Sequence, residues 1–127
     1  MPEAILEHAN ITVHSVQQSA ALFCRLFDWK VRWQGDSIHG GRTIHVGGKG
    51  SYLALYENPK KSNAITDTYY QINGLNHICL IVSDLDDVER RVQDEGLTPI
   101  NHANYEPGRR FYFKTNDNIE VEVVDYK

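Results

Sequence analysis

Hydrophobic and polar residues alternate in a short segment near the N-terminus and again near the middle of the chain. Residues 8–13 read HANITV and residues 77–82 read HICLIV, so both follow the pattern H-x-x-[I/L]-x-V. Alternation with a period of two is typical of a β-strand. A pattern that returns once predicts two similar modules, because a solenoid needs at least three repeats.

A helix start follows each of these segments. Ser15 stands three residues before Gln18, and Asp84 stands three residues before Asp87, which is the spacing of a capping box. Apolar residues then recur at helical spacing. They are Leu22, Phe23, Leu26 and Phe27 in the first copy, and Leu85, Val88 and Val92 in the second, where Gly96 suits the end of the helix.

Three further strands are predicted after each helix, separated by glycine, proline and asparagine turns. The pattern predicts an α+β fold of two βαβββ modules, whose curved mixed sheets surround a cleft with the helices on the outer faces. Residues 1–127 form one domain in this interpretation, with module one at about 5–58, a linker at about 59–74 and module two at about 75–126. The strands are expected at 30–34, 42–46 and 51–57 in the first module, and at 98–102, 109–114 and 119–125 in the second.

Composition narrows the class of protein. The formal net charge of −4 is not the basic balance of a nucleic-acid-binding protein. The longest aliphatic run, residues 78–82, is far shorter than the roughly 20 residues that span a membrane. Two cysteines are too few for a disulfide framework, and the N-terminus lacks the pattern of a secretory signal. We therefore expect a cytoplasmic protein that binds a small molecule and neither nucleic acid nor membrane.

Three residues on these strands suggest a metal site. If the apolar sets pack on the helices, His8, His77 and Glu122 all point to the other side of their sheets. Two imidazoles and one carboxylate suit a divalent metal such as Fe, Mn, Ni or Zn with open coordination positions. Each residue alone is more commonly an ordinary surface or core residue, and Glu120 is a rival to Glu122 on the same strand face. The repeat favours the metal site, because it places a histidine at the same point of both modules.

Several other residues are candidates for contact with a substrate. Arg110 shares a face with Tyr112 and could bind a carboxylate or phosphate, although a solvated edge is the competing interpretation. Tyr52 and Tyr56 are expected on a cavity wall, and Asn10 follows His8 on the same face. Cys79 is expected to be a small wall residue and Cys24 a helix residue near the core, whereas His14, His39 and His45 are expected to be structural or surface residues.

The repeated opening pattern and the segment FYFKTNDNIEVEV at residues 111–123 resemble the vicinal oxygen chelate superfamily. That superfamily includes glyoxalase I, fosfomycin-resistance thiol transferases, extradiol dioxygenases, methylmalonyl-CoA epimerases and metal-free bleomycin-resistance proteins. The resemblance implies a fold of paired βαβββ modules, His8, His77 and Glu122 as metal ligands, Tyr112 as a residue that handles protons, and a homodimer.

The sequence also departs from the patterns of individual members. Ala54 stands where glyoxalase I has a fourth ligand, and the nearby Glu57 falls on the other strand face. Asn10 replaces the threonine of the thiol transferases. Tyr112 and His102 partly match the dioxygenase pattern, but residues 60–76 lack the additional histidine of that pattern.

Two functions are consistent with these features. The first is a divalent-metal-dependent enzyme (a lyase, isomerase or ring-cleaving dioxygenase) that polarises adjacent oxygens of a small substrate, with Glu122 and Tyr112 as catalytic residues. The second is a metal-free protein, similar to the bleomycin-resistance proteins, that sequesters a small cationic ligand in an acidic, aromatic cleft.

Overall fold

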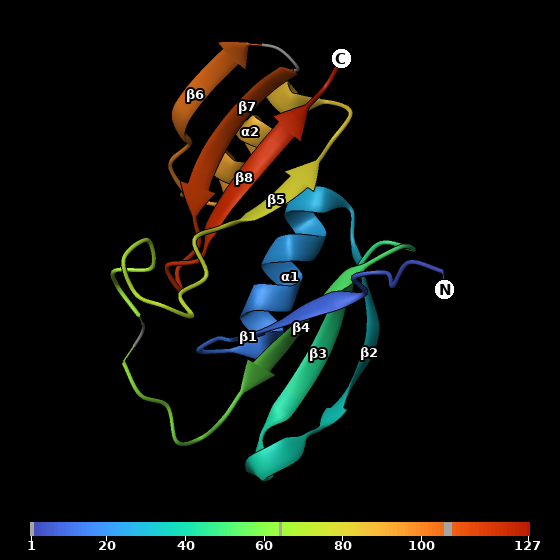
Figure 1. The fold of residues 1–127 in the computed structure, drawn as a ribbon, viewed down its shortest axis with the longest axis vertical. Helices are drawn as coiled ribbons and strands as arrows, with labels where there is room; N and C mark the ends of the chain where they lie inside the picture. The colour runs from blue at the N-terminus through green and yellow to red at the C-terminus, as the bar shows by residue number, and fades with distance from the viewer. Residues whose placement is uncertain (1, 64, 106–107) are drawn as a thin grey trace. The chain divides into compact units, whose positions relative to one another are not determined.

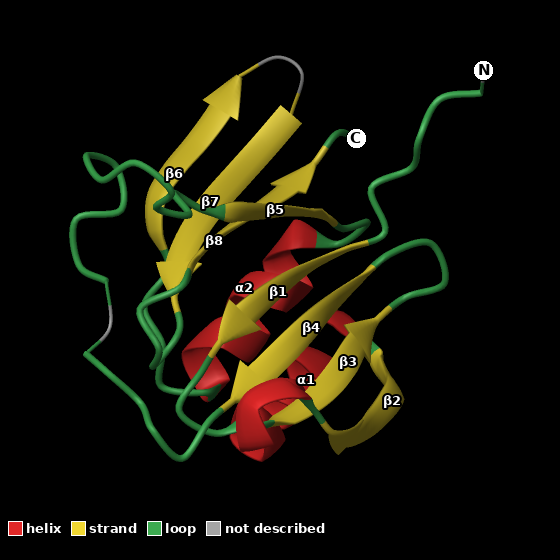
Figure 2. Cartoon of the chain, turned by 60° about the horizontal axis from the view of Figure 1, so that its bottom comes forward, coloured by secondary structure: helices red, strands yellow, loops and turns green. Residues whose placement is uncertain are grey.

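The computed structural model describes residues 2–63, 65–105 and 108–127. The chain forms two compact units, with the boundary between Ser62 and Asn63. Each unit is a four-stranded mixed sheet with one α-helix against it (Figures 1 and 2). This confirms the predicted α+β fold of two βαβββ modules.

The first unit has the strand order β1-β4-β3-β2. Strands β1 and β4 are parallel, and the other neighbours are antiparallel. A 3-10 turn, η1, connects β2 to β3. The elements are β1 (His8–Thr12), α1 (Val16–Phe27), β2 (Lys30–Asp36), η1 (Ile38–Gly40), β3 (Arg42–Gly47) and β4 (Tyr52–Glu57).

The second unit repeats this arrangement with the order β5-β8-β7-β6. Here β5 is parallel to β8, whereas β7 is antiparallel to both β8 and β6. The elements are β5 (Ile78–Ile81), α2 (Leu85–Asp94), β6 (Ile100–Tyr105), β7 (Gly108–Lys114) and β8 (Glu120–Asp125). The repeat in the sequence therefore corresponds to a repeat in topology.

Both helices begin at the predicted caps. The Ser15 hydroxyl accepts a hydrogen bond from the Gln18 backbone N–H at 3.2 Å, and the Asp84 carboxylate accepts one from the Asp87 N–H at 3.1 Å. These bonds satisfy one of the N–H groups that a helix leaves unpaired at its start. Helix α1 is followed by Asp28, whose φ of 56° is left-handed and ends the helix. Gly96, with a φ of 78°, is the left-handed residue that follows α2.

Each sheet buries one face against its helix and leaves the other for polar residues. The face toward α1 carries Ile44, Val46, Leu53 and Leu55, which pair across β3 and β4. The face toward α2 carries Phe111, Phe113, Val121 and Val123, all completely buried. Since side chains alternate along a strand, the residues between them point away from the helices.

Some boundaries differ from prediction, and β2 runs two residues further, to Asp36. Strand β6 starts at Ile100 and continues to Tyr105, because a register shift at Asn101 (φ 55°) lets pairing with β7 resume beyond it. The turn expected near residues 106–108 lies partly outside the described residues. The predicted linker also crosses the boundary between the units, so that most of it, from Asn63 onward, belongs to the second unit. There Asn76 donates a hydrogen bond to the Thr68 carbonyl.

Neither helix in the described part of the chain has the length and apolar content needed to cross a membrane.

The cap of α1 generates a stability prediction. Ser15→Ala removes the acceptor for the Gln18 N–H, so we expect the free energy of unfolding to fall by about 1 kcal/mol. Urea denaturation followed by circular dichroism measures this loss. Ser62→Ala, at an exposed position near the boundary between the units, is the matched control and should change the midpoint little. Equal effects of the two substitutions would contradict the capping role.

Candidate functional site

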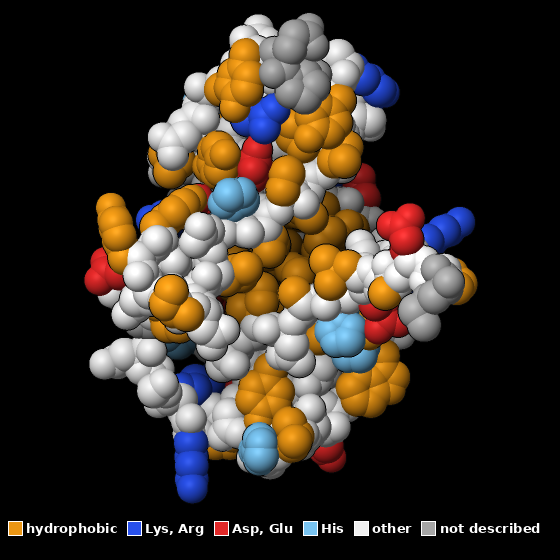
Figure 3. Space-filling model, in the orientation of Figure 1, with side chains coloured by type: hydrophobic (Ala, Val, Ile, Leu, Met, Phe, Trp, Pro, Cys, Tyr) orange, Lys and Arg blue, Asp and Glu red, His pale blue; other side chains and the backbone are white. Residues whose placement is uncertain are grey.

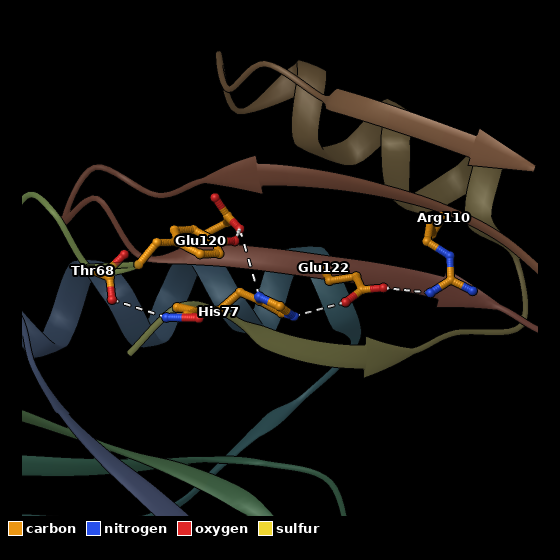
Figure 4. A network of polar contacts seen from close by, with 7 residues as sticks. Thr68, His77, Arg110, Glu120 and Glu122 are labelled. Atoms are coloured by element: carbon orange, nitrogen blue, oxygen red, sulfur yellow. Dashed lines mark hydrogen bonds and ion pairs between the residues drawn. The ribbon is translucent and has the colours of Figure 1, made fainter. Parts of the chain in front are cut away.

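His77 in the second unit lies between two carboxylates of strand β8. Its Nε2 is 3.1 Å from Glu122 Oε1, and its Nδ1 is 3.9 Å from Glu120 Oε2 (Figure 4). Glu120 and Glu122 alternate with the buried valines of β8, so both project from the face away from α2. The parallel pairing of β5 with β8 sets Cys79 opposite Glu122, which brings the preceding His77 within reach.

Glu122 is held by a cation on the neighbouring strand. Arg110 Nη1 donates a hydrogen bond to Glu122 Oε2 at 2.8 Å, and the two side chains are only 13% and 8% exposed (Figure 4). The Arg110 guanidinium also lies over the Tyr105 ring, 4.9 Å from its centroid. A buried carboxylate needs such a partner, because removal from water strongly disfavours an unpaired charge. Arg110 therefore engages one oxygen of Glu122 and leaves Oε1 facing His77.

The spacing of His77 and Glu122 fits a divalent metal. Two ligands of one metal, with bonds of about 2.0–2.2 Å and an angle of about 90–110°, lie about 3–3.5 Å apart. His77 Nε2 and Glu122 Oε1 have this separation. His77 Nδ1 is buried and has no hydrogen-bond partner among the described residues. The nitrogen and oxygen of this pair are the donor types that bind Fe, Mn, Ni and Zn.

Tyr112 and Cys79 flank this pair on the same sheet face. Tyr112 pairs with Glu122 across β7 and β8, and its ring meets His77 edge-on at 5.7 Å between centroids. Burial, followed by the Glu122 carboxylate, raises the pKa of Tyr112, so its phenol stays protonated at neutral pH. The same two causes raise the pKa of Cys79, which favours the unreactive thiol.

Glu120 has a partner that the sequence did not reveal. Tyr69, in the segment predicted as a linker, donates a hydrogen bond to Glu120 Oε2. This hydrogen bond, followed by burial, raises the pKa of Tyr69 to about 12. A shallow hollow of about 110 Å³ lies here, lined by residues 66–70, Lys114, Asn118 and Glu120. The segment before β5 therefore contributes to the site, and no periodicity marked it in the sequence.

The first unit places His8 in a group of aromatic rings. The His8 ring stacks on Tyr52 at 4.8 Å between centroids, and Tyr52 stacks on His45 at 4.6 Å. Asn10 follows His8 on the same exposed strand face. Histidine side chains reach the surface beside hydrophobic ones in Figure 3. His45, predicted to be a structural or surface residue, belongs to this group, and the register of β3 with β4 is the signal that identifies it.

Glu7 connects His8 to Tyr52. One oxygen of Glu7 lies 2.9 Å from His8 Nδ1 and accepts a hydrogen bond from the Tyr52 hydroxyl at 3.0 Å. The hydrogen bond to His8, then that to Tyr52, lowers the pKa of Glu7. Arg32 adds a positive charge 4.4 Å from the Tyr52 ring centroid. No sequence pattern identified Glu7, because it precedes the first strand and belongs to no periodic segment.

Tyr56 and Glu57 serve the fold of the first unit. The Tyr56 hydroxyl donates to the Ile38 carbonyl at 2.6 Å and accepts from Asn58 Nδ2 at 2.8 Å. Glu57 lies on the helix face, where its Oε1 accepts a hydrogen bond from the Val16 backbone N–H at the start of α1. Strand alternation predicted that Glu57 lies on the opposite face from Ala54. The Tyr56 hydroxyl is thus already engaged within the first unit, and its role in substrate binding stays a prediction.

His102 lies on the helix side of its sheet. Its ring stacks on buried Phe111 at 5.9 Å, and its Nε2 is 3.0 Å from Glu89 of α2. Tyr112, the next residue after Phe111, points to the other face of the sheet. These two elements of the dioxygenase pattern therefore do not share a site in this unit.

In the part of the chain that the structure describes, no three His, Cys, Asp or Glu side chains are grouped so as to hold a metal. His77 and Glu122 are a pair, and His8 has its own surroundings in the first unit. His77, Arg110, Tyr112 and Glu122 lie together in the second unit, and their roles stay predictions.

Comparison with known proteins identifies the family. The chain belongs to the Glyoxalase/Bleomycin resistance protein/Dioxygenase superfamily, whose model matches residues 5–123. This match confirms the resemblance found in the sequence. No curated protein matches the chain at a significant level.

Solved structures with this fold include three similar chains. A glyoxylase/bleomycin resistance protein/dioxygenase domain from Frankia sp. EAN1pec is 21% identical, with a TM-score of 0.83 over 99% of this chain and 100% of that one. The fosfomycin resistance protein FosX from Mesorhizobium loti is 22% identical, with a TM-score of 0.71 over 98% and 92%. The genomically encoded FosX from Listeria monocytogenes is 15% identical, with a TM-score of 0.74 over 100% and 96%. At these identities the likeness shows a shared fold.

The Tyr69–Glu120 hydrogen bond generates a pH prediction. Titration of phenolate absorbance should contain a tyrosine component with a pKa of about 12, raised from the ordinary 10.0. Because the folded-state pKa is raised, the bond stabilises the fold fully below about pH 10, and the stabilisation is lost as the pH rises toward 12. Tyr69→Phe should remove this component, and Glu120→Gln should return it toward 10.0, since the amide lacks the charge. Glu3→Gln is the charge-matched control, and a high component that survives Tyr69→Phe would contradict the assignment.

Proposed function

We propose that this protein is a divalent-metal-dependent enzyme of the glyoxalase and dioxygenase type, which acts on a small substrate with adjacent oxygen atoms. His8, His77 and Glu122 are the proposed metal ligands. The observation that carries the proposal is the 3.1 Å separation of His77 Nε2 and Glu122 Oε1, beside an arginine that is hydrogen-bonded to the other carboxylate oxygen. Membership of the superfamily supports it.

The residues around the pair have distinct proposed roles. Arg110 orients Glu122 and neutralises part of its charge, so that one oxygen remains for the metal. Tyr112, with its protonated phenol next to both ligands, donates a hydrogen bond or a proton to a substrate oxygen. The Arg110 Nε is buried without a hydrogen-bond partner among the described residues, so this side chain retains a donor for a substrate oxygen. Asn10, Tyr52 and Tyr56 are the proposed substrate contacts of the first unit.

A bound divalent metal would supply a Lewis acid that polarises the substrate oxygens and stabilises negative charge on them. Fe, Mn, Ni and Zn all suit two imidazoles and a carboxylate. His8 is supplied by the same chain or by a second copy in the proposed homodimer.

A metal-free binding protein is the second candidate function. It is favoured by the ion pair of Arg110 with Glu122, which already gives the buried carboxylate a cationic partner. In this alternative, the acidic and aromatic side chains of the chain bind a cationic ligand directly.

Metal titration tests the ligand set. After treatment with chelator and dialysis, the protein should bind one Mn²⁺, Fe²⁺, Ni²⁺ or Zn²⁺ per chain in isothermal titration calorimetry. Loss of a residue that only orients a metal ligand raises the dissociation constant by about 10–100-fold. His8→Ala, His77→Ala and Glu122→Gln should each raise it by more than this, because each removes a direct ligand. His102→Ala is the matched control, since His102 lies on the other sheet face.

An effect of His102→Ala as large as that of His77→Ala would contradict the ligand assignment. Mixing of His8→Ala with Glu122→Gln chains then identifies the source of His8. Recovery of tight binding in the mixture shows that two copies share a site, and no recovery shows that each chain builds its own.

Thermal shift with and without EDTA separates the two candidate functions. The metal-dependent enzyme should gain melting temperature from metal and substrate together and lose that gain when EDTA is added. Stabilisation by cationic aromatic compounds that survives EDTA would instead support the binding protein and overturn the metal-dependent function.

A further inference from the structure

We propose that Glu7 and Tyr52 are positioning residues that hold His8 with its proton on Nδ1 and its Nε2 free to bind the metal. The inference rests on the proposed function in taking His8 as a metal ligand. The position of the proton on His8 is a property of the metal-free protein and can be measured without a metal. In this role both residues act through His8, to which Glu7 is hydrogen-bonded and on which Tyr52 stacks.

The position of the proton follows from the partner of Nδ1. His8 Nδ1 lies 2.9 Å from Glu7 Oε1, which is an ordinary hydrogen-bond distance. A carboxylate only accepts hydrogen bonds, so the imidazole nitrogen that faces it carries the proton. In a neutral imidazole the other nitrogen, Nε2, then keeps its lone pair, which is the form that binds a metal.

Tyr52 fixes the carboxylate and the ring together. Its hydroxyl donates to the same Glu7 oxygen at 3.0 Å, and its backbone N–H donates to the Glu7 carbonyl at 3.1 Å. Its ring stacks on His8 at an interplanar angle of 14°, and the parallel register of β1 and β4 places the two residues side by side. These contacts restrict rotation of both the carboxylate and the imidazole.

His77 lacks this arrangement and is an internal reference. Its Nε2 already faces Glu122 at 3.1 Å, whereas its Nδ1 has no hydrogen-bond partner among the described residues. Glu120 is the carboxylate nearest to Nδ1, at 3.9 Å, beyond hydrogen-bond distance. The two histidines therefore start from different proton positions, and His8 alone is prepared as an Nε2 ligand.

A carboxylate that orients a histidine ligand is worth about 10–100-fold in metal affinity. Glu7→Ala should therefore raise the metal dissociation constant by about 10-fold or more, and Tyr52→Phe, which keeps the stacked ring, should have a smaller effect. Glu3→Ala removes a nearby exposed carboxylate and is the matched control, for which we expect no change.

Nitrogen-15 NMR of the full-length, metal-free chain tests the inference directly, at a pH where the imidazoles are neutral. Wild-type His8 should show a protonated Nδ1, and Glu7→Ala should shift it toward the Nε2-protonated form that free histidine prefers. His77 should keep its spectrum in Glu7→Ala, and Glu3→Ala should alter neither residue.

An Nε2 proton on wild-type His8, or no change in Glu7→Ala, would overturn the inference. Unchanged metal affinity in Glu7→Ala, with tight binding by the wild type, would also overturn the positioning role. If the wild type binds no metal but the NMR result holds, the proposed function fails and the assigned proton position stands.

Discussion

The side chains of the candidate site in the second unit are arranged around the buried carboxylate of Glu122. A carboxylate that is 8% exposed destabilises a fold unless it is paired, and here a guanidinium and an imidazole lie on its two oxygens. The strands next to β8 must therefore supply polar or charged partners for Glu122. Arg110 and Tyr112 come from β7, and His77 is the residue immediately before β5. Three separate segments thereby supply one small group of polar side chains. They are aligned by the antiparallel register of β7 with β8 and the parallel register of β5 with β8.

The two repeated histidines have acquired different surroundings on the same topology. His8 is bonded to the residue before it in the chain and stacked against the parallel strand β4. His77 is placed between two carboxylates of the parallel strand β8. The charged neighbours differ as well, because the carboxylate that faces His77 is paired with Arg110, whereas the carboxylate that faces His8 is hydrogen-bonded to Tyr52.

Much of this architecture was predictable from local patterns. The caps at Ser15 and Asp84 are local signals, and period-two alternation sorts His77 and Glu122 from the buried valines because it needs only the strand itself. The bond of Glu7 to His8 and the bond of Tyr69 to Glu120 were not predicted, since both involve residues outside regular strands. The hydrogen bond from the Tyr56 hydroxyl to the Ile38 carbonyl also depends on the conformation of a turn, which no sequence pattern specifies. The stacking of His45 on Tyr52 was not predicted either, because it depends on the register of β3 with β4 and not only on the order of the strands.

The proposed function requires that His8, His77 and Glu122 bind one cation. Crystals of the metal-loaded protein, measured at the absorption edge of the metal, test it most directly. We expect an anomalous peak at about 2.0–2.2 Å from Nε2 of both histidines and from Glu122 Oε1, with His8 from the same or a second copy. An anomalous peak elsewhere, or one at His77 and Glu122 that no His8 approaches, would contradict the claim.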